Sequence, residues 1–373
     1  MQKDKLVPDI RFKGFEEEWK TNRLCEVALK FDNLRIPVSE SLRIKGPYPY
    51  YGANGVQDYV SGFTHNGEFV LIAEDGANDL DSYPSNYVNG KFWANNHVHV
   101  LKGFKDTLDN KFLNYSFTNV NFKPLLTGGD RAKLTASALD TINIKVPIFN
   151  EQRKIGSLLN NIDQLLLSQK SKLEKLQIIK QSLLNKMFAS GDQKMPEIRF
   201  KGFDQDWKRA MLSDCLDYER PDKYIEKLPL LEFGQIPVLT ANKSFKLGYT
   251  ESQNYYAKGD CILFDDFTLD SKYVDFPFMV VSSALKILSL KNSRDSLPYY
   301  FAILKNNTFE SQGHARHYIS IVAKTPIKIS DSIEERNLIG LLFTNLDSLI
   351  HSQEQKLEKL NNIKQALLEK MFC

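Results

Sequence analysis

The stretch at residues 155–188, IGSLLNNIDQLLLSQKSKLEKLQIIKQSLLNKMF, returns at residues 339–372 as IGLLFTNLDSLIHSQEQKLEKLNNIKQALLEKMF. The two copies are 184 positions apart, and 21 of their 34 positions are identical. Neither copy contains proline, and neither contains glycine after its second residue, so each can form an uninterrupted helix. The chain is therefore predicted to contain one long helix twice.

Apolar residues recur along both copies at alternating spacings of four and three, as in a coiled coil. The expected core positions are Ile155, Leu159, Ile162, Leu166, Leu173, Leu176, Leu183 and Met187 in the first copy, and Ile339, Phe343, Leu346, Ile350, Leu357, Leu360, Leu367 and Met371 in the second. The remaining heptad places hold Gln169 and Lys180, and Gln353 and Lys364. Such a narrow stripe needs a facing helix of the same period. We expect the two copies to pair antiparallel within one chain, with the glutamines as polar layers that fix the register. The alternatives are that each helix packs on its own domain or that the chain dimerises.

A second repeat precedes each variable region of the chain. Residues 7–15 read VPDIRFKGF and residues 195–203 read MPEIRFKGF, and Trp19-Lys20 and Trp207-Lys208 follow at the same separation of 188. The segments between these tags and the helices are largely dissimilar. The order is thus tag, variable domain and helix, repeated once.

This order predicts an α+β protein with a pseudo-twofold internal repeat. We expect a first domain at residues 1–149, a first helix at 150–191, a second domain at 192–332 and a second helix at 333–373. Short strands are expected at residues 68–73, 93–101, 260–264 and 279–290, and short helices at 110–118 and 297–306.

Composition excludes several classes of protein and favours none. The chain has 49 basic and 46 acidic residues, and both variable segments are neutral, with 18 residues of each sign in 1–150 and 19 of each in 192–333. Bulk charge therefore gives no argument for nucleic-acid binding. No run approaches the roughly 18 apolar residues of a membrane helix. The four scattered cysteines indicate neither a zinc site nor a disulfide framework, so we expect a cytoplasmic protein.

The layout resembles the specificity subunits of type I restriction–modification systems. The resemblance rests on the tags, on Thr127-Gly128-Gly129 followed by Lys133-Leu134, on EQRKI at residues 151–155, and on Asp163 and Asp347 inside the helices. It covers nearly the whole chain. The second copy departs from the pattern, because one extra residue precedes Ile339 and Ser311-Gln312-Gly313 replaces the Thr-Gly-Gly element.

The resemblance implies a non-catalytic reader of DNA. Each variable domain would be a target recognition domain for one half of an asymmetric double-stranded DNA site, and the helices would be the spacer that docks two modification subunits. Those adenine methyltransferases would bring S-adenosylmethionine, and motor–nuclease restriction subunits would bring ATP and Mg²⁺. A helix of 33 residues is roughly 50 Å long, which exceeds the about 34–36 Å of one DNA turn. Such a complex would methylate DNA and defend against foreign DNA.

Candidate DNA contacts are loop residues that combine amide, basic and aromatic side chains with glycine. Amides can pair with adenine and basic groups with guanine, and glycine loops can expose N–H groups to phosphate. The candidates are Tyr51, Asn54, Gln57, His97, Gly129, Arg131 and Lys133 in the first domain, and Asn242, Lys243, His314, Arg316 and Tyr318 in the second. The alternative for each is ordinary turn chemistry.

No motif indicates catalysis or a bound metal. The methyltransferase tetrapeptide, a glycine-rich cofactor loop and a P-loop are missing from the sequence. His97 and His99 would point to one face of a strand, but no third ligand stands near them in the sequence. Pro8-Asp9 and Pro221-Asp222 lack the partner residues of a nuclease. A metal-dependent nuclease and a bivalent coiled-coil adaptor remain the competing hypotheses.

Overall fold

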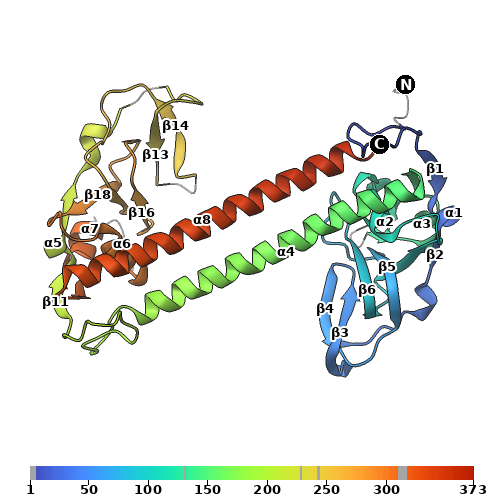
Figure 1. Cartoon of the computed structure of the whole chain (residues 1–373), viewed down its shortest axis with the longest axis horizontal. Helices are drawn as coiled ribbons and strands as arrows, with labels where there is room; N and C mark the ends of the chain where they lie inside the picture. The colour runs from blue at the N-terminus through green and yellow to red at the C-terminus, as the bar shows by residue number, and fades with distance from the viewer. Residues whose placement is uncertain (1–5, 130–131, 227–228, 242–243, 310–316) are drawn as a thin grey trace. The chain divides into compact units, whose positions relative to one another are not determined.

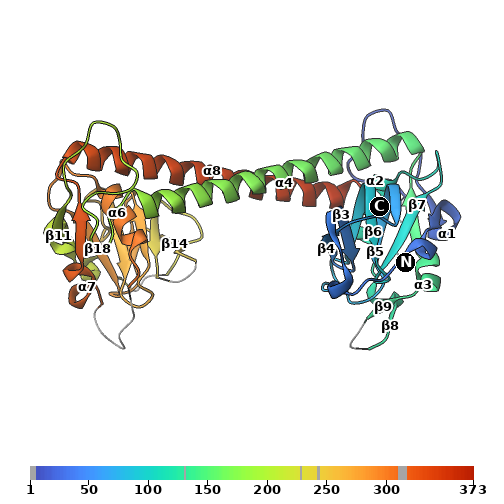
Figure 2. The same ribbon diagram turned by 90° about the horizontal axis from the view of Figure 1, so that it is seen from below.

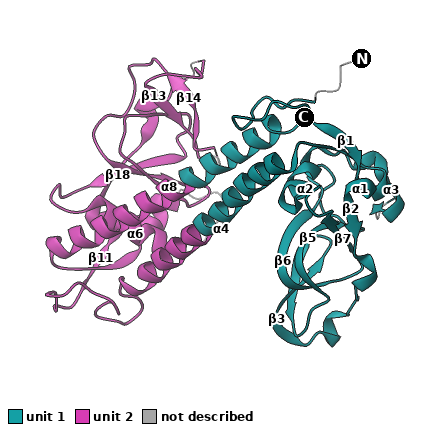
Figure 3. Ribbon diagram, turned by 45° about the vertical axis from the view of Figure 1, so that its right-hand side comes forward, with its two compact units in different colours: residues 1–170, 355–373 teal, residues 171–354 magenta. Residues whose placement is uncertain are grey.

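The chain divides into two compact units. The structure, a computed structural model, describes residues 6–129, 132–226, 229–241, 244–309 and 317–373. Unit 1 comprises residues 1–170 and 355–373, and unit 2 comprises residues 171–354 (Figure 3). Two helices, α4 (Phe149–Lys186) and α8 (Ile333–Lys370), each contribute one end to each unit. No helix in the described part of the chain has the length and apolar character needed to cross a bilayer.

The two long helices pack against each other within each unit (Figure 1). All sixteen expected core positions are buried or part-buried, whereas most other positions on the helices are exposed. In unit 1, Ile155 near the start of α4 shares a core with Met371 just past the end of α8. In unit 2, Met187 just past the end of α4 shares a core with Ile339 near the start of α8. The prediction of an antiparallel pair within one chain is therefore confirmed.

Charged pairs mark the register of these helices. Lys364 Nζ lies 2.6 Å from Asp163 Oδ1 in unit 1, and Lys180 is hydrogen-bonded to Asp347 in unit 2. The lysines that interrupt the apolar stripe thus find acids on the facing helix. Of the two expected glutamine layers, Gln353 is buried and Gln169 is part-buried.

Unit 1 is built on one six-stranded sheet. Its strand order is β2-β7-β5-β6-β3-β4, with every neighbouring pair antiparallel except β3 and β6. The strands are β2 (Ala28–Lys30), β3 (Lys45–Gly52), β4 (Gly55–Val60), β5 (His65–Ala73), β6 (Ser85–Ala94) and β7 (Val98–Gly103).

Helix α2 (Asn110–Ser116) lies between this sheet and the long helices (Figure 2). Its Phe112 stacks on Phe372 with ring centroids 5.3 Å apart, and Trp19 from the tag packs edge-on against both rings. The core of unit 1 is therefore assembled from the tag, the variable region and the ends of both repeats. Its smaller elements are β1 (Lys20–Arg23), α1 (Leu24–Val27), β8 (Leu126–Thr127), β9 (Lys133–Leu134), α3 (Ala136–Asp140), β10 (Asn143–Val146) and the 3-10 turns Asp32–Leu34, Glu40–Leu42, Phe117–Asn119 and Lys123–Leu125.

Unit 2 divides its strands between two larger sheets. One has the order β12-β18-β15-β16 and the other β14-β13-β17, and β11 pairs with β19 apart from both. The strands are β11 (Lys208–Met211), β12 (Leu216–Glu219), β13 (Ile236–Leu239), β14 (Lys246–Thr250), β15 (Cys261–Asp265), β16 (Ser271–Val274), β17 (Met279–Val280), β18 (Leu285–Leu290) and β19 (Pro326–Ile329). The helical elements are α5 (Leu212–Cys215), α6 (Leu297–Asn306), α7 (His317–Ser320) and the 3-10 turns Pro221–Tyr224 and Val322–Lys324.

Two of the expected strands are wrong in their extent. The segment at residues 93–101 is split, because β6 ends at Ala94 and β7 begins at Val98. The Asn95 side chain accepts a hydrogen bond from the His97 N–H (2.8 Å), which stabilises a turn in place of extended backbone. The segment at residues 279–290 is split in the same way between β17 and β18. The expected helix at residues 297–306 coincides with α6.

Candidate nucleic-acid interface

Six of the seven candidates in unit 1 lie on segments that meet at one end of its sheet. The first is Asn54, in the turn between β3 and β4. Its Nδ2 donates to the Gly76 carbonyl at 3.0 Å, and its Oδ1 accepts from the Asn78 N–H at 2.9 Å. Asn54 is exposed, and it also braces this hairpin against the loop that follows β5.

Tyr51 and Gln57 connect the same hairpin to the turn between β6 and β7. The Tyr51 carbonyl accepts from the Asn95 N–H at 3.1 Å, and Gln57 Oε1 accepts from Asn95 Nδ2 at 3.5 Å. The Tyr51 ring packs edge-on against Phe92, and burial raises the pKa of its hydroxyl. Gln57 is exposed, so its side chain can reach a ligand at the surface.

His97 and His99 do not lie on one strand as expected. His97 lies in the turn, part-buried, with Nδ1 hydrogen-bonded to the Asp75 carboxylate. His99 lies on β7 with only 1% of its surface exposed, and its Nδ1 is 2.6 Å from Asp32 Oδ2. The turn at residues 95–97 breaks the strand alternation on which the expectation rested.

Gly129 and Lys133 belong to the β8–β9 hairpin. Gly129 has φ +55°, a conformation that favours glycine, and its side is open because a Cβ there would meet nothing within 4 Å. Lys133 Nζ lies 2.9 Å from Glu74 Oε1, and this hydrogen bond raises the pKa of Lys133. Arg131 lies outside the described residues.

A group of charged side chains lies next to these segments. Arg35 Nη1 donates to Glu74 Oε2 at 2.5 Å. Burial acts to raise the pKa of Glu74, but hydrogen bonds from Arg35 and Lys133 outweigh it and hold that pKa below its usual range. Ligand atoms of Asp32, Glu74 and His99 lie within 4.8 Å of one another, which is close enough to surround a metal ion. Arg35 and Lys133 already supply the positive charge there, so the group is better described as an ion-pair network.

The second-domain candidates are distributed differently. Asn242, Lys243, His314 and Arg316 lie outside the described residues. Tyr318 is 1% exposed, and its ring stacks on Tyr218 with centroids 5.3 Å apart. Burial raises the pKa of its hydroxyl. The geometry therefore makes Tyr318 a core residue and gives no support to a surface contact.

Several polar residues that pair inside the two units belong to no sequence motif. Asp32, Arg35 and His99 in unit 1 come from separate segments, so no local spacing brings them together. Lys286 and Asp266 in unit 2 form a buried pair with Nζ and Oδ2 3.1 Å apart. The one available signal was the acidic pair after an apolar run, which occurs as Glu74-Asp75 and again as Asp265-Asp266.

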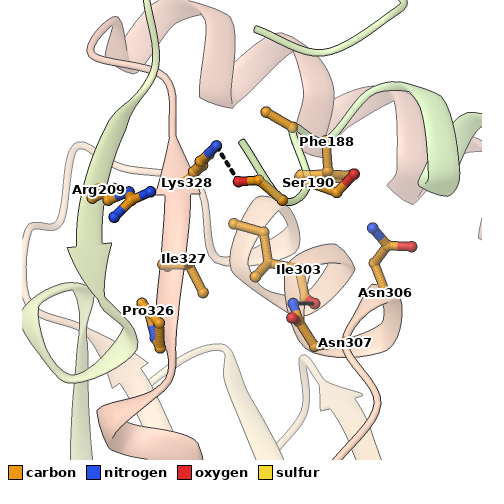
Figure 4. Close-up of a pocket in the computed structure, with 11 residues that line it drawn as sticks. Phe188, Ser190, Arg209, Ile303, Asn306, Asn307, Pro326, Ile327 and Lys328 are labelled. Carbon is orange, nitrogen blue, oxygen red and sulfur yellow. Dashed lines mark hydrogen bonds between the residues drawn. The ribbon is translucent and has the colours of Figure 1, made fainter. Parts of the chain in front are cut away.

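A cavity of about 430 Å³ lies in unit 2 where the chain leaves α4. Figure 4 shows Arg209 and Lys328 on one side and Asn306 and Asn307 on the other. Lys328 Nζ donates to the Gly191 carbonyl at 2.6 Å, so its charge is used to hold the turn after α4. The lining includes none of the predicted DNA contacts.

Comparison with known proteins agrees with this architecture. The family described as "Type I restriction modification DNA specificity domain" matches residues 16–177 and again residues 204–362. A putative type I restriction enzyme specificity subunit of Haemophilus influenzae is 48% identical over 165 residues, which make up 44% of this chain and 42% of that protein. The EcoR124I/EcoR124II specificity subunit of Escherichia coli is 36% identical over 143 residues, 36% of this chain and 35% of that protein. Each match thus spans less than half of the curated relative.

A solved structure has the same fold. The type I restriction–modification S subunit from M. genitalium superposes with a TM-score of 0.79 over 98% of this chain and 99% of that one, at 16% identity. The two family matches cover the variable domains and most of both helices, and each begins just after a tag. The chain therefore belongs to the family of type I restriction–modification DNA specificity subunits.

Proposed function

We propose that the chain reads a split double-stranded DNA sequence, one half with each unit, and has no catalytic activity of its own. The observation that carries this proposal is a constant framework around two sheets that differ. The tags, the hydrogen bonds from Arg11 to Glu151 and from Arg199 to Glu335, and the helix pair recur, while the sheets differ beyond four corresponding strands. Two dissimilar recognition domains on one framework suit a DNA target whose two halves differ. The proposed domains are residues 1–149 and 192–332, with spacers at 150–191 and 333–373.

In unit 1 the proposed contacts are the exposed or part-buried candidates at the end of the sheet. They are Tyr51, Asn54, Gln57, His97, Gly129 and Lys133. In unit 2 they are Asn242, Lys243, His314 and Arg316. Because both domains are neutral, partner subunits would supply much of the phosphate contact. The chain alone should then bind DNA weakly, with an affinity that falls steeply with salt.

The helices also offer two equivalent surfaces for partner subunits. Leu165 and Ile363 in unit 1 are 43% and 42% exposed, and Leu349 and Ile179 in unit 2 are 55% and 48% exposed. The repeat relates Leu165 to Leu349 and Ile179 to Ile363. In unit 1, Leu165 and Ile363 are within two residues of the Asp163–Lys364 ion pair in sequence, so they lie at the same level of the helix pair. Two copies of one apolar patch suit two copies of one partner.

We propose that these partners are the methyltransferase subunits and that they bring S-adenosylmethionine. Restriction subunits would bring ATP and Mg²⁺. The test is stoichiometry by native mass spectrometry. Leu165→Asp with Ile363→Asp should leave one methyltransferase bound, and the four-site variant should leave none. Leu167→Asp, at an exposed α4 position whose repeat counterpart is His351, is the control and should leave two. Full binding by the four-site variant would contradict the docking proposal.

The recognition proposal is tested by domain exchange. Residues 21–149 are replaced with the matching stretch of a relative, and methylated sites are mapped across a genome in the complete methyltransferase complex. One half of the target should change, while the other half and the spacer length stay the same. A change in both halves would contradict separate reading. Insertion of one heptad into both helices should lengthen the spacer.

A further inference from the structure

The cavity of unit 2 at the end of α4 holds two cations that stand directly opposite each other. Arg209 on β11 pairs with Lys328 on β19 in the antiparallel register, and both side chains line the cavity (Figure 4). Like charges at directly opposite positions of two strands destabilise the strand pair. The presence of both cations is therefore not explained by the stability of the fold.

The residues around the two cations do not neutralise them. Lys328 Nζ donates to the Gly191 carbonyl at 2.6 Å and also to the Gln193 carbonyl, but a carbonyl carries no full negative charge. Arg209 is exposed, and its side chain forms no ion pair or hydrogen bond with another described residue. No aspartate or glutamate is among the lining residues, all of which belong to the described part of the chain. The cavity is therefore suited to an anion.

The remaining lining residues suit an anionic group that is attached to carbon atoms. Phe188 and Ile303 are 5% and 4% exposed and form an apolar wall of the cavity. Asn307 donates Nδ2 to the Ile303 carbonyl at 2.7 Å, so its Oδ1 can accept from a backbone N–H of a ligand. An acidic side chain of a protein offers a carboxylate for Arg209, methylene groups for the wall and a backbone amide. The cavity of about 430 Å³ has room for such a group.

The position of the cavity favours a protein ligand over DNA. Its walls include the end of α4 and the strand pair β11–β19, and none of the candidate DNA contacts lines it. Phe188 follows Ile179 by nine residues, which corresponds to roughly 14 Å along a helix. Ile179 belongs to the exposed apolar surface of unit 2 on which a partner subunit is proposed to dock. A subunit that covers Ile179 can therefore also reach the cavity.

Unit 1 has a smaller cavity at the matching place, of about 140 Å³. Four lining residues recur in the two cavities: Phe372, Asn119, Ile144 and Lys145 match Phe188, Asn306, Ile327 and Lys328. The counterpart of Arg209 is Thr21, which pairs with Lys145. The pair of opposed cations is thus a feature of unit 2 that unit 1 does not share.

We propose that the cavity of unit 2 binds an acidic side chain of the partner subunit that docks on this unit, with the carboxylate on Arg209 and Lys328. This inference rests on the proposed function, in which one methyltransferase subunit docks on each unit. Because Thr21 replaces the arginine in unit 1, the two subunits are held unequally. The subunit on unit 2 is held more tightly, and its binding is more sensitive to salt.

The test measures binding of the purified methyltransferase subunit to the full chain with Leu165→Asp and Ile363→Asp, in which only unit 2 should dock. Arg209→Thr, which copies unit 1, should raise the Kd about tenfold, as expected for the loss of one charged hydrogen-bonded pair. Arg209→Lys keeps the charge and should recover part of this loss. Lys223→Thr removes an exposed cation of unit 2 outside the cavity lining, so this control should leave the Kd unchanged.

Raising the salt concentration from about 0.05 M to about 0.5 M should weaken wild-type docking on unit 2 more than docking of Arg209→Thr. The free Arg209→Thr chain should melt no lower than wild type, since the repulsion from Lys328 is removed. A lower melting temperature would indicate a structural role and overturn the inference, as would an unchanged Kd or a loss that appears only with DNA present. If the chain with Leu165→Asp and Ile363→Asp still binds two subunits, the proposed docking surface fails. The cavity is then tested in the natural chain, where Arg209→Thr should weaken one of the two binding steps.

Discussion

The two units use the same framework contacts around sheets that differ. In unit 1, Arg11 of the tag forms two hydrogen bonds with Glu151 of α4, at 2.7 and 2.8 Å. In unit 2, Arg199 does the same with Glu335 of α8, at 2.6 and 2.9 Å. The tags also bind the other helix end, because Ile10 donates its N–H to the Lys370 carbonyl and Ile198 donates its N–H to the Lys186 carbonyl. Each tag therefore ties the start of one long helix to the end of the other.

The sheets differ beyond four corresponding strands. In unit 1, β3 pairs in parallel with β6, and the sheet is continuous. In unit 2, β13 pairs in parallel with β17, and the sheet divides into two. The other four strands keep the same order, since β2-β7-β5-β6 corresponds to β12-β18-β15-β16. Part of each sheet is thus constant and part varies, which suits a reader whose target can change.

The largest expected effect on stability comes from breaking one of the arginine–glutamate pairs that join a tag to a long helix. Arg11→Met leaves the carboxylate of Glu151 buried, at 0% exposure, without its cation. We expect the free energy of unfolding of unit 1 to fall by about 3–5 kcal/mol, measured by urea unfolding with hydrogen exchange assigned to each unit. Arg199→Met should do the same in unit 2. Replacing both Arg11 and Glu151 with methionine should recover part of the loss. A loss below about 1 kcal/mol would mean that the buried acid finds another partner.

Substitution of two glycines at matched positions should destabilise the two units by different amounts. A Cβ on Gly156 would lie 2.6 Å from the Phe112 backbone nitrogen. One on Gly340 would meet the Ser296 hydroxyl, which can rotate only by losing its hydrogen bond from the Tyr299 N–H. We expect Gly156→Ala to cost about 2–3 kcal/mol and Gly340→Ala about 1 kcal/mol, by the same unfolding measurement. Ser168→Ala, on the exposed face of α4, should be neutral. Equal costs at the two glycines would show that α2 shifts as readily as the serine rotates.

The two lysines inside the apolar stripe should contribute less to the free energy of unfolding than the residues above. Lys364→Met and Lys180→Met each remove a part-exposed ion pair, so we expect losses of at most about 1 kcal/mol. The loss should be smaller for Lys364, because the Tyr115 hydroxyl also donates to Asp163 Oδ2 at 2.6 Å. Double-mutant cycles with Asp163→Asn and Asp347→Asn measure the coupling, and Lys175→Met on the exposed face is the control. Coupling that is larger in unit 1 would contradict this ranking.

The smallest expected effect is on the stability of unit 1 at acidic pH. The pKa of Glu74 is held below its usual 4.5, so its contribution to stability is complete above that pH and is lost as the pH falls through the lowered value. Glu74→Gln should therefore flatten the acid side of the stability curve of unit 1 by about 1 kcal/mol or less. Unit 2 serves as the internal control in the same hydrogen-exchange experiment. An unchanged acid slope would show that Arg35 and Lys133 lose nothing when Glu74 is protonated.

Sequence alone determined the features that repeat along the chain. The heptad spacing and the duplicated tags predict the helix pair, the two-unit organisation and the family, because periodicity and self-similarity can be read directly from the order of residues in the chain. The loop candidates at Asn54, Gln57, His97 and Lys133 follow from residue type, and the structure brings their segments together.

Only the tertiary structure decided which buried side chains meet. His99 meets Asp32 across 67 positions, and Lys286 meets Asp266 across a strand pair. Tyr318 belongs to the core because its ring stacks on Tyr218. Such pairs depend on strand order and register, which are settled by burial across the whole sheet and leave no mark on local spacing.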